Sequence, residues 1–208
     1  MEILLVVLGA YLLGSISFAI VVSRLFALPD PRTYGSNNPG ATNVLRTGKK
    51  AAAALTLLGD GGKGWLAVFV ASIFVPGAVA YAGLSVFLGH LFPVFHRLQG
   101  GKGVATAAGV LLGLDWRIGL GTIGTWVIIL AFFRYSSLAA LISAIFAAVF
   151  TALFYGLGVE ALCVVVMSAL LVWRHKENIR RLLRGEESRV GAKPQTNAEP
   201  PAPSAGGQ

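Results

Sequence analysis

The chain has 208 residues and a formal net charge of +8 at pH 7, with 55% hydrophobic and only 12% charged residues. The apolar residues form long unbroken runs, which excludes an ordinary soluble domain and indicates an integral membrane protein. In a soluble protein the positive net charge would suggest nucleic-acid binding. In a membrane protein it is explained by basic residues that set the orientation, so we expect no nucleic-acid partner. A single cysteine, Cys163, excludes an internal disulfide and a metal cluster built on cysteines.

Seven apolar segments follow one another along the chain, and we predict an all-α protein with seven transmembrane helices. A full crossing needs about 20 residues at about 1.5 Å rise each, so the fourth segment is short and should cross only part of the bilayer. The second segment contains the glycine-rich run from Asp60 to Gly64, which is expected to bend its helix or end it early. The segments are 3–22, 51–74, 77–95, 104–114, 118–133, 138–155 and 159–173.

The basic residues are distributed asymmetrically between the ends of these segments. Seven crossings place the termini on opposite sides, and lysine and arginine accumulate on the cytoplasmic side of membrane proteins. Only Arg117 falls on the side that is poor in basic residues, while Lys63 lies within a segment. We therefore expect the N-terminus outside, the C-terminus in the cytoplasm, and both glycine-rich loops on the cytoplasmic face.

The C-terminal part divides into two segments of different composition. Residues 178–184 continue the last span as a short basic amphipathic helix, which is expected to lie against anionic headgroups. Residues 188–208 are rich in proline, alanine, glycine and polar residues without an apolar period. Such a segment buries too little apolar surface to offset the entropy of ordering. We expect one membrane domain, residues 1–187, followed by a disordered cytoplasmic tail.

Two glycine-rich loops carry the residue types that bind anions. Glycines let backbone N–H groups approach a ligand closely, and a helix that begins after Gly103 would add its positive end to the Lys102 ammonium. The other loop has hydroxyls, amides and a guanidinium that suit phosphate or acyl carbonyl oxygens. The candidates are Gly35, Ser36, Asn38, Gly40, Thr42, Asn43 and Arg46 in the first loop, and Gly100, Gly101, Lys102, Gly103 and Thr106 in the second.

Each loop also has an ordinary explanation. Lys102 can reach headgroup phosphates from a tight interfacial turn, and glycine, asparagine and serine are common in plain connections. The length of the connection from Ala27 to Lys50 favours a functional loop, since long connections in compact proteins tend to be functional. A Walker A nucleotide site is unsupported because no serine or threonine follows Lys102.

Further polar residues lie within or next to the apolar segments. Asp60 and Lys63 are three residues apart, so they either neutralise each other on one helix face or belong to a functional site. His175 and Asn178 share this spacing at the end of the last span. His175 is either a favourable helix cap or a phosphate donor and proton carrier.

The carboxylates are scattered along the chain, so we expect no metal site and no cofactor. The sequence also lacks the Gly-x-Ser-x-Gly motif of serine hydrolases. An enzyme with this inventory would work by positioning and charge stabilisation, without a covalent intermediate. His90 and His96, which flank the third segment, are interpreted as structural.

The order of these motifs resembles that of the PlsY family of bacterial acyl-phosphate-dependent glycerol-3-phosphate acyltransferases. The resemblance covers nearly the whole chain up to about residue 187. Its main departure is Gln99, where a lysine is frequent in the family. The motifs are Gly14-Ser15-Ile16-Ser17, Asp30-Pro31-Arg32, Gly35-Ser36-x-Asn38-x-Gly40-Ala41-Thr42-Asn43-Val44-x-Arg46, Asp60-x-x-Lys63-Gly64, Gly89-His90-x-x-Pro93-x-Phe95, residues 100–106, Ser137-Leu138-Ala139 and Arg174-His175-x-Glu177-Asn178-Ile179.

The resemblance implies transfer of a fatty acyl group from acyl phosphate to the sn-1 hydroxyl of glycerol 3-phosphate, giving lysophosphatidic acid and phosphate. It implies a seven-span protein of the bacterial plasma (inner) membrane, with membrane lipid and both substrates as partners. The glycines of residues 100–103 would shape the glycerol-phosphate pocket, and Glu186 matches a family position of structural character. The family's catalytic roles fall on Ser36, Arg46, Lys102, Ser137, His175 and Asn178.

An activated acyl phosphate needs no nucleophilic side chain. We expect direct attack by the glycerol hydroxyl, whose proton goes either to the leaving phosphate or to His175, while Arg46, Lys102 and Ser137 stabilise the developing charge. The alternative function is membrane transport of phosphate or an anionic metabolite. The gathering of polar clusters on one face, without related halves, argues against transport.

Overall fold

The computed structural model describes residues 1–191, which are helical and contain no strand. The all-α expectation is therefore confirmed for this range, while the tail from residue 192 lies outside it. Two short 3-10 helices, η1 (Pro76–Ala78) and η2 (Val94–His96), flank α5. The α-helices are α1 (Glu2–Gly14), α2 (Phe18–Leu25), α3 (Ala41–Leu45), α4 (Lys50–Phe74), α5 (Val79–Leu91), α6 (Val104–Leu114), α7 (Trp116–Phe133), α8 (Ser136–Tyr155), α9 (Val159–Arg174) and α10 (Lys176–Arg184).

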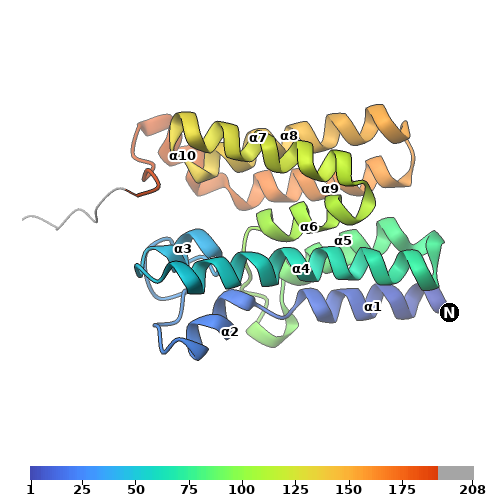
Figure 1. The fold of residues 1–208 in the computed structure, drawn as a ribbon, viewed down its shortest axis with the longest axis horizontal. Coiled ribbons are helices and arrows are strands. Elements are labelled where there is room, and N and C mark those ends of the chain that lie inside the picture. The colour runs from blue at the N-terminus through green and yellow to red at the C-terminus, as the bar shows by residue number, and fades with distance from the viewer. Residues whose placement is uncertain (192–208) are drawn as a thin grey trace, which may run out of the picture.

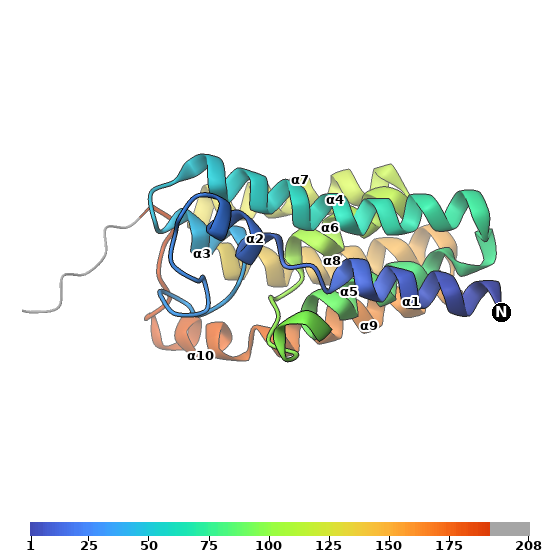
Figure 2. The same cartoon turned by 90° about the horizontal axis from the view of Figure 1, so that it is seen from below.

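The long helices run along one axis of an elongated bundle (Figure 1). One group contains α1, α4 and α5, and the other contains α7, α8 and α9. The short helix α6 lies between them, because it contacts α4 and α5 on one side and α7 on the other. Figure 2, seen from below, shows the N-terminus at the end of the bundle opposite α10.

Several helices are suited to cross a membrane. Four stretches of the described residues are long and apolar enough, namely α4, the stretch Pro76–His96 that contains α5, α7 and α8. A fifth results if α1 and α2 together form one span. The segment from Val104 has 11 residues, as short as expected. Large apolar side chains stay exposed along these helices, for example Phe132 and Leu153, as in proteins that face lipid.

The first apolar segment is broken, which the sequence analysis did not expect. Helix α1 ends at Gly14 and α2 begins at Phe18, with a bend of 40° between them. A break leaves backbone groups without helical partners, and these are costly inside a membrane. The Lys63 ammonium donates to the Ile16 carbonyl at 2.6 Å, and the Phe18 N–H donates to Asp60 Oδ1 at 3.4 Å. Two side chains of α4 thus stabilise the break.

The expectation that the run from Asp60 to Gly64 bends or ends its helix is wrong, because α4 is continuous from Lys50 to Phe74. The glycines instead let α6 approach. A Cβ atom on Gly64 would lie 2.3 Å from the Thr106 carbonyl oxygen, and one on Gly109 would lie 1.9 Å from the Gly61 carbonyl oxygen. Backbone packed against backbone leaves no room for side chains, so small residues hold α4 and α6 together.

Asp60 and Lys63 form a buried ion pair, with Lys63 Nζ 2.9 Å from Asp60 Oδ1. His90 Nδ1 of α5 lies 3.5 Å from the same oxygen. Mutual neutralisation, one of the two explanations considered for this pair, is therefore present in the structure. His90 joins α5 to α4 through the pair, which agrees with its structural interpretation.

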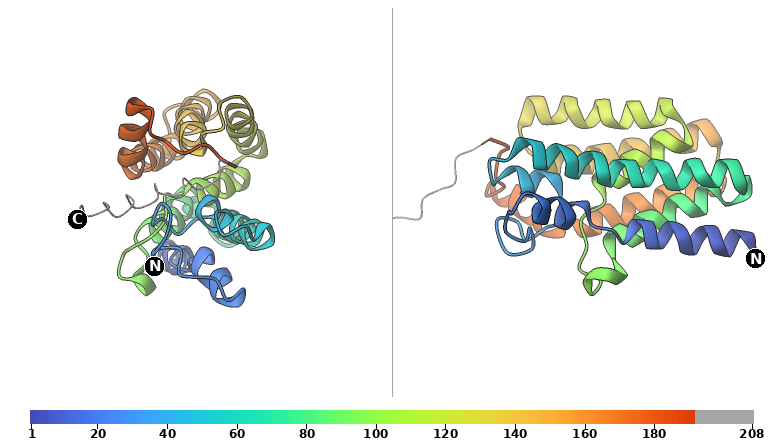
Figure 3. Two further views of the ribbon diagram at one scale, coloured as in Figure 1. Left: turned by 90° about the vertical axis from the view of Figure 1, so that its left-hand side faces the viewer. Right: turned by 60° about the horizontal axis from the view of Figure 1, so that its bottom comes forward.

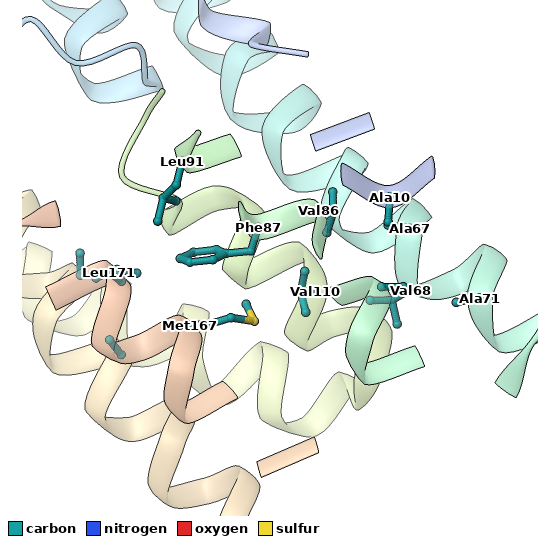
Figure 4. Close-up of a cluster of buried hydrophobic side chains, with 13 residues drawn as sticks. Ala10, Ala67, Val68, Ala71, Val86, Phe87, Leu91, Val110, Met167 and Leu171 are labelled. Carbon is teal, nitrogen blue, oxygen red and sulfur yellow. The ribbon is translucent and has the colours of Figure 1, made fainter. Parts of the chain in front are cut away.

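The central apolar core joins the two helix groups (Figure 4). Phe87 and Leu91 of α5, Val110 of α6, and Met167 and Leu171 of α9 are each less than 5% exposed. Removing a buried side chain of this size costs about 2–5 kcal/mol. This core fixes the start of α6 and the end of α9 relative to each other, and both carry candidate site residues.

We predict that Lys63→Met destabilises the protein by about 3–5 kcal/mol, because it leaves the buried Asp60 carboxylate without its cation and the Ile16 carbonyl without a donor. Thermal unfolding in detergent, followed by tryptophan fluorescence, measures the change. The double variant Asp60→Asn/Lys63→Met should regain part of the loss, and Lys49→Met, at an exposed lysine, should change little. Equal stability of Lys63→Met and the parent protein would show that the pair does not stabilise the break.

Candidate functional site

Three polar segments that are distant in sequence come together near one end of the bundle (Figure 3). The loop of residues 35–46 reaches the start of α8 through Thr42 Oγ1, 3.3 Å from Ser136 Oγ. The same loop reaches the chain after α10, where the Arg46 guanidinium donates to Ser188 Oγ at 2.7 Å. The residues after α10 return to the start of α8, since the Val190 N–H donates to the Arg134 carbonyl at 2.7 Å.

Lys102 and Asn178 meet at the centre of this arrangement, although 76 residues separate them. The Lys102 ammonium donates to Asn178 Oδ1 at 2.5 Å. The Asn178 amide then donates to Glu187 Oε1 at 2.6 Å, and the Ser137 hydroxyl donates to the same oxygen at 2.6 Å. Arg181 Nε completes the cluster at 2.7 Å from Glu187 Oε2. We call Lys102, Ser137, Asn178, Arg181 and Glu187 the Glu187 cluster.

Glu187 is the acidic residue that sequence reasoning missed, because the structural position was assigned to Glu186. Glu186 is exposed, whereas the Glu187 side chain is 7% exposed and accepts three hydrogen bonds. The only sequence signal is Gly185, which ends α10 in the left-handed region with φ of 71° and turns the chain back. That signal predicts a reversal but not which carboxylate points inward.

Burial and like charges weaken the hold of Lys102 on its proton. Burial and the neighbouring Arg181 lower the pKa of Lys102 to about 8, with smaller contributions from Arg174 and Arg46. Although burial alone would raise it, hydrogen bonds from Ser137, Asn178 and Arg181 hold the pKa of Glu187 below its usual value. The Lys102 ammonium, partly buried and close to other basic groups, is well placed to bind an anion, and the anion would offset the repulsion among these groups.

Hydrogen bonds from Arg174 and to His90 hold the glycine turn before α6 in place. The Arg174 guanidinium donates to the carbonyls of Gly100 at 2.7 Å and Gly101 at 3.2 Å. The Gly101 N–H donates to the His90 carbonyl at 3.1 Å. The Gly101 N–H is thus bonded within the protein, contrary to the expectation that the glycine N–H groups of this turn approach a ligand. Gly103 has φ of 86°, which favours glycine, and caps the start of α6 without a side-chain acceptor.

The loop of residues 35–46 is organised by Asn43. Its amide donates to the carbonyls of Pro31 at 2.8 Å and Tyr34 at 3.1 Å, and its Oδ1 accepts from the Ser36 N–H at 3.0 Å. All three bonds lie within residues 31–43, so Asn43 holds the loop against the chain that precedes it. Its side-chain amide has no donor left for a ligand, contrary to its assignment as a binding residue. Gly35 packs on Asn43 with φ of 59°. The exposed residues of the loop that carry donors include Ser36 and Arg46.

The remaining candidates divide by their exposure. His175 is 3% exposed, and its Nδ1 lies 2.8 Å from the Leu171 carbonyl. Burial, together with the nearby Lys102 ammonium, lowers the pKa of His175 to about 4. Thr106 is fully buried where α6 packs on Gly64 of α4. A ligand cannot reach it, contrary to the expectation that Thr106 binds substrate. Gly40 caps α3, beside the partly buried Asn38.

Within residues 1–191, no three histidine, cysteine, aspartate or glutamate side chains are close enough together to hold a metal ion. The Glu187 cluster offers cations and hydroxyl groups that Glu187 holds in place through hydrogen bonds. Such a set can bind phosphate groups and stabilise negative charge that develops between them.

The chain is similar to proteins of one kind. The family model "Glycerol-3-phosphate acyltransferase" matches residues 4–185. A glycerol-3-phosphate acyltransferase of Cupriavidus taiwanensis is 61% identical over 196 residues, which cover 91% of this chain and 97% of the relative. One of Burkholderia pseudomallei is 58% identical over 203 residues, covering 95% and 100%.

Two solved structures have the same fold. Both are crystal structures of PlsY (YgiH), described as an integral membrane glycerol 3-phosphate acyltransferase. The glycerol 3-phosphate form has a TM-score of 0.86 and 38% identity, covering 92% of this chain and 96% of that one. The lysophosphatidic acid form has a TM-score of 0.84 and 37% identity, covering 91% and 95%.

We predict that anion binding weakens by about tenfold as the pH rises from about 7 to about 9, because Lys102 loses its charge above its pKa of about 8. Sulfate is a suitable probe, since its own charge is constant over this range, and calorimetric titration of the protein in uncharged detergent measures its affinity. Lys102→Arg should remove the pH dependence, because a guanidinium does not lose its proton. The same decline in Lys102→Arg would assign it to another group.

We predict that Gly101→Ala weakens sulfate binding by about tenfold, because a displaced turn misplaces the adjacent Lys102. A Cβ atom there would lie 2.2 Å from His90 Nε2 and 2.9 Å from the Pro39 carbonyl oxygen, so the turn must move. Gly62→Ala is the matched control, since a Cβ on Gly62 meets nothing within 4 Å. The same titration compares the two variants, and equal affinities would show that the turn does not position the lysine.

Proposed function

The chain belongs to the glycerol-3-phosphate acyltransferase family, and on this premise we propose which of its residues carry out the reaction. It is a multi-pass membrane enzyme of phospholipid synthesis that acylates glycerol 3-phosphate. Membership of this family supports acyl transfer as the function of the chain, and not the alternative of transporting phosphate or an anionic metabolite. The observation that carries the proposal is the contact between Lys102 and Asn178, which joins the glycine turn to the end of the last long helix.

The glycerol 3-phosphate headgroup is bound by the cations around the glycine turn. Lys102 supplies a desolvated ammonium, and the first N–H groups of α6 add the positive end of a helix without a capping side chain. Arg46, at the edge of the cluster, supplies a planar pair of donors that matches a phosphate. The Ser36 hydroxyl is exposed on the same loop and can donate to a further oxygen.

The acyl donor is an acyl phosphate that stays in the membrane. Burying an acyl chain gains about 0.8 kcal/mol per CH2, so a long-chain acyl phosphate exposes only its head at the surface. The exposed apolar side chains along the helices keep the enzyme in the same layer. Two phosphate-bearing substrates therefore meet at the interface, where the excess of basic residues offsets their mutual repulsion.

The reaction is a direct displacement at the acyl carbonyl carbon. The sn-1 hydroxyl oxygen forms the new ester bond, the bond from the acyl carbon to the phosphate oxygen breaks, and inorganic phosphate leaves with the electron pair. The two cations, Lys102 and Arg46, stabilise the negative charge that develops on the carbonyl and phosphate oxygens. Ser137 already donates its hydroxyl to Glu187, so we assign it to holding the Glu187 cluster instead of stabilising the charge.

The leaving phosphate is the better acceptor for the hydroxyl proton. A general base works best with a pKa near the operating pH, whereas the pKa of His175 is about 4. Phosphate monoesters have a second pKa of about 6. We assign His175 a positioning role, because its Nδ1 is bound to the Leu171 carbonyl and Lys102 is near enough to lower its pKa.

The proposed topology has seven crossings with the N-terminus outside and the site on the cytoplasmic face of the inner membrane. Its support is the position of the N-terminus at the end of the bundle opposite the glycine loop of residues 35–46 and α10 (Figure 1). The basic residues gather at the latter end, as the positive-inside rule requires of a cytoplasmic face. Cysteine accessibility at Glu2 and Arg184 in intact cells tests this orientation.

We predict that Lys102→Ala lowers kcat/KM by about 10²–10³-fold, because it removes a cation that stabilises the developing charge. His175→Ala should cost about tenfold or less, since the proton goes to the leaving phosphate. Product formation by purified protein from palmitoyl phosphate and glycerol 3-phosphate measures both. A loss of about 10²-fold or more in His175→Ala, with a changed pH profile of kcat, would make His175 the base.

A further inference from the structure

A second basic cavity lies outside the Glu187 cluster. It has a volume of about 530 Å³, within the range of ligand sites, and none of the proposed reaction residues lines it. Its wall combines the last turn of α2, the connection that follows it, and the connection between α5 and α6. The charged and titratable residues in the wall are Arg24, Asp30, Arg32, His96 and Arg97.

The charges of this cavity are unbalanced. Asp30 is occupied by Arg32, whose Nη2 lies 2.7 Å from Oδ2 and whose Nε lies 3.0 Å from Oδ1. Among residues 1–191, Arg24 and Arg97 make no ion pair within 4 Å and no side-chain hydrogen bond. Two guanidinium groups without carboxylate partners in one cavity form a site for an anion, because each offers paired donors that fit a phosphate.

The backbone beside the cavity is held in an uncommon conformation. Arg97 and Leu98 are consecutive residues in the left-handed region, with φ of 53° and 60°. Such a conformation is unfavourable for residues other than glycine and persists where the surrounding structure requires it, often at binding sites. Hydrogen bonds from the Leu98 N–H to the Pro93 carbonyl and from the Gln99 N–H to the His96 carbonyl fix this turn.

Exposed apolar residues lie next to the basic residues of the cavity in the chain. Figure 3 shows η2 and its connection projecting from the side of the bundle instead of its end. The side chains of Phe95 and Leu98 on this connection are 60% and 56% exposed, and Leu25 at the end of α2 is 77% exposed. Exposed apolar side chains next to unpaired cations match an amphiphile, whose head is anionic and whose chain lies along protein and lipid.

We propose that the cavity of Arg24, Arg32 and Arg97 is a second phosphate-binding site and that its occupant is the phosphate head of an anionic lipid. Arg24 and Arg97 bind the phosphate oxygens, while Asp30 keeps Arg32 in place. Gln99 lies in the cavity wall and precedes Gly100 in the chain, so a lipid bound here lies next to the glycine turn. The site is independent of the assignment of the reaction residues, since it shares none of them.

Calorimetric titration with monododecyl phosphate, which has no acyl group to transfer, tests the proposal on the full chain in uncharged detergent. All variants carry Lys102→Ala to weaken binding at the reaction site. Adding Arg24→Ala and Arg97→Ala should weaken binding by about tenfold or more. Adding Lys49→Ala and Lys50→Ala, which removes two exposed charges outside the cavity, should leave the affinity unchanged.

Two further measurements decide between the remaining outcomes. Arg24→Lys with Arg97→Lys keeps the charge and should bind more tightly than the alanine pair, which separates a lost site from a misfolded protein. Inorganic phosphate should compete only weakly. Competition as strong as that of monododecyl phosphate would overturn the lipid assignment in favour of free phosphate. Equal affinities of the arginine pair and the control pair would overturn the site itself.

Discussion

The organisation of the site depends on one carboxylate that holds several cations together without neutralising them. Glu187 accepts hydrogen bonds from Ser137, Asn178 and Arg181, and Asn178 in turn accepts a hydrogen bond from Lys102. Lys102 therefore stays close to other basic groups in a partly buried position, which lowers its pKa to about 8. In the proposed binding mode a phosphate-bearing substrate relieves this repulsion, which favours binding of the substrate.

The buried polar residues of α4 support this arrangement from below. Lys63 and Asp60 bond the backbone at the break between α1 and α2, and His90 next to them lies under Gly101. The break thus connects the membrane interior to the glycine turn through a few close contacts. A buried ion pair contributes little by itself, but removing one partner is costly because the other charge stays buried.

The short helix α6 places its positive end next to Lys102, where we propose that the reaction takes place. It begins in the interior of the fold because glycines of α4 and α6 allow backbone contact, and because Phe87, Leu91 and Met167 fill the space beside it. A helix long enough to cross the bilayer would begin at the surface, further from the acyl chains. The shortness of α6 and the depth of its N-terminus are therefore one structural feature.

Composition and motif order were sufficient to predict an all-α membrane protein, its family and most residues that meet around Lys102. Long apolar runs report membrane helices directly, because each residue contributes to the average independently of its neighbours. Lys102, Asn178 and Arg46 were recognisable because polar groups beside apolar spans are rare and need a reason, whereas Ser137 was assigned only through the family resemblance.

The tertiary structure decided what depends on contacts between distant residues. Only the structure shows that the first span is broken and that α4 is continuous through its glycines. It also shows that Thr106 is buried and that Glu187, not Glu186, points inward. The partners of Ile16, Asn43 and Glu187 are set by packing and not by neighbours in the chain. Local composition determines which groups need a hydrogen bond, but only the folded arrangement determines which partner lies within reach, because donor and acceptor distances depend on the whole bundle.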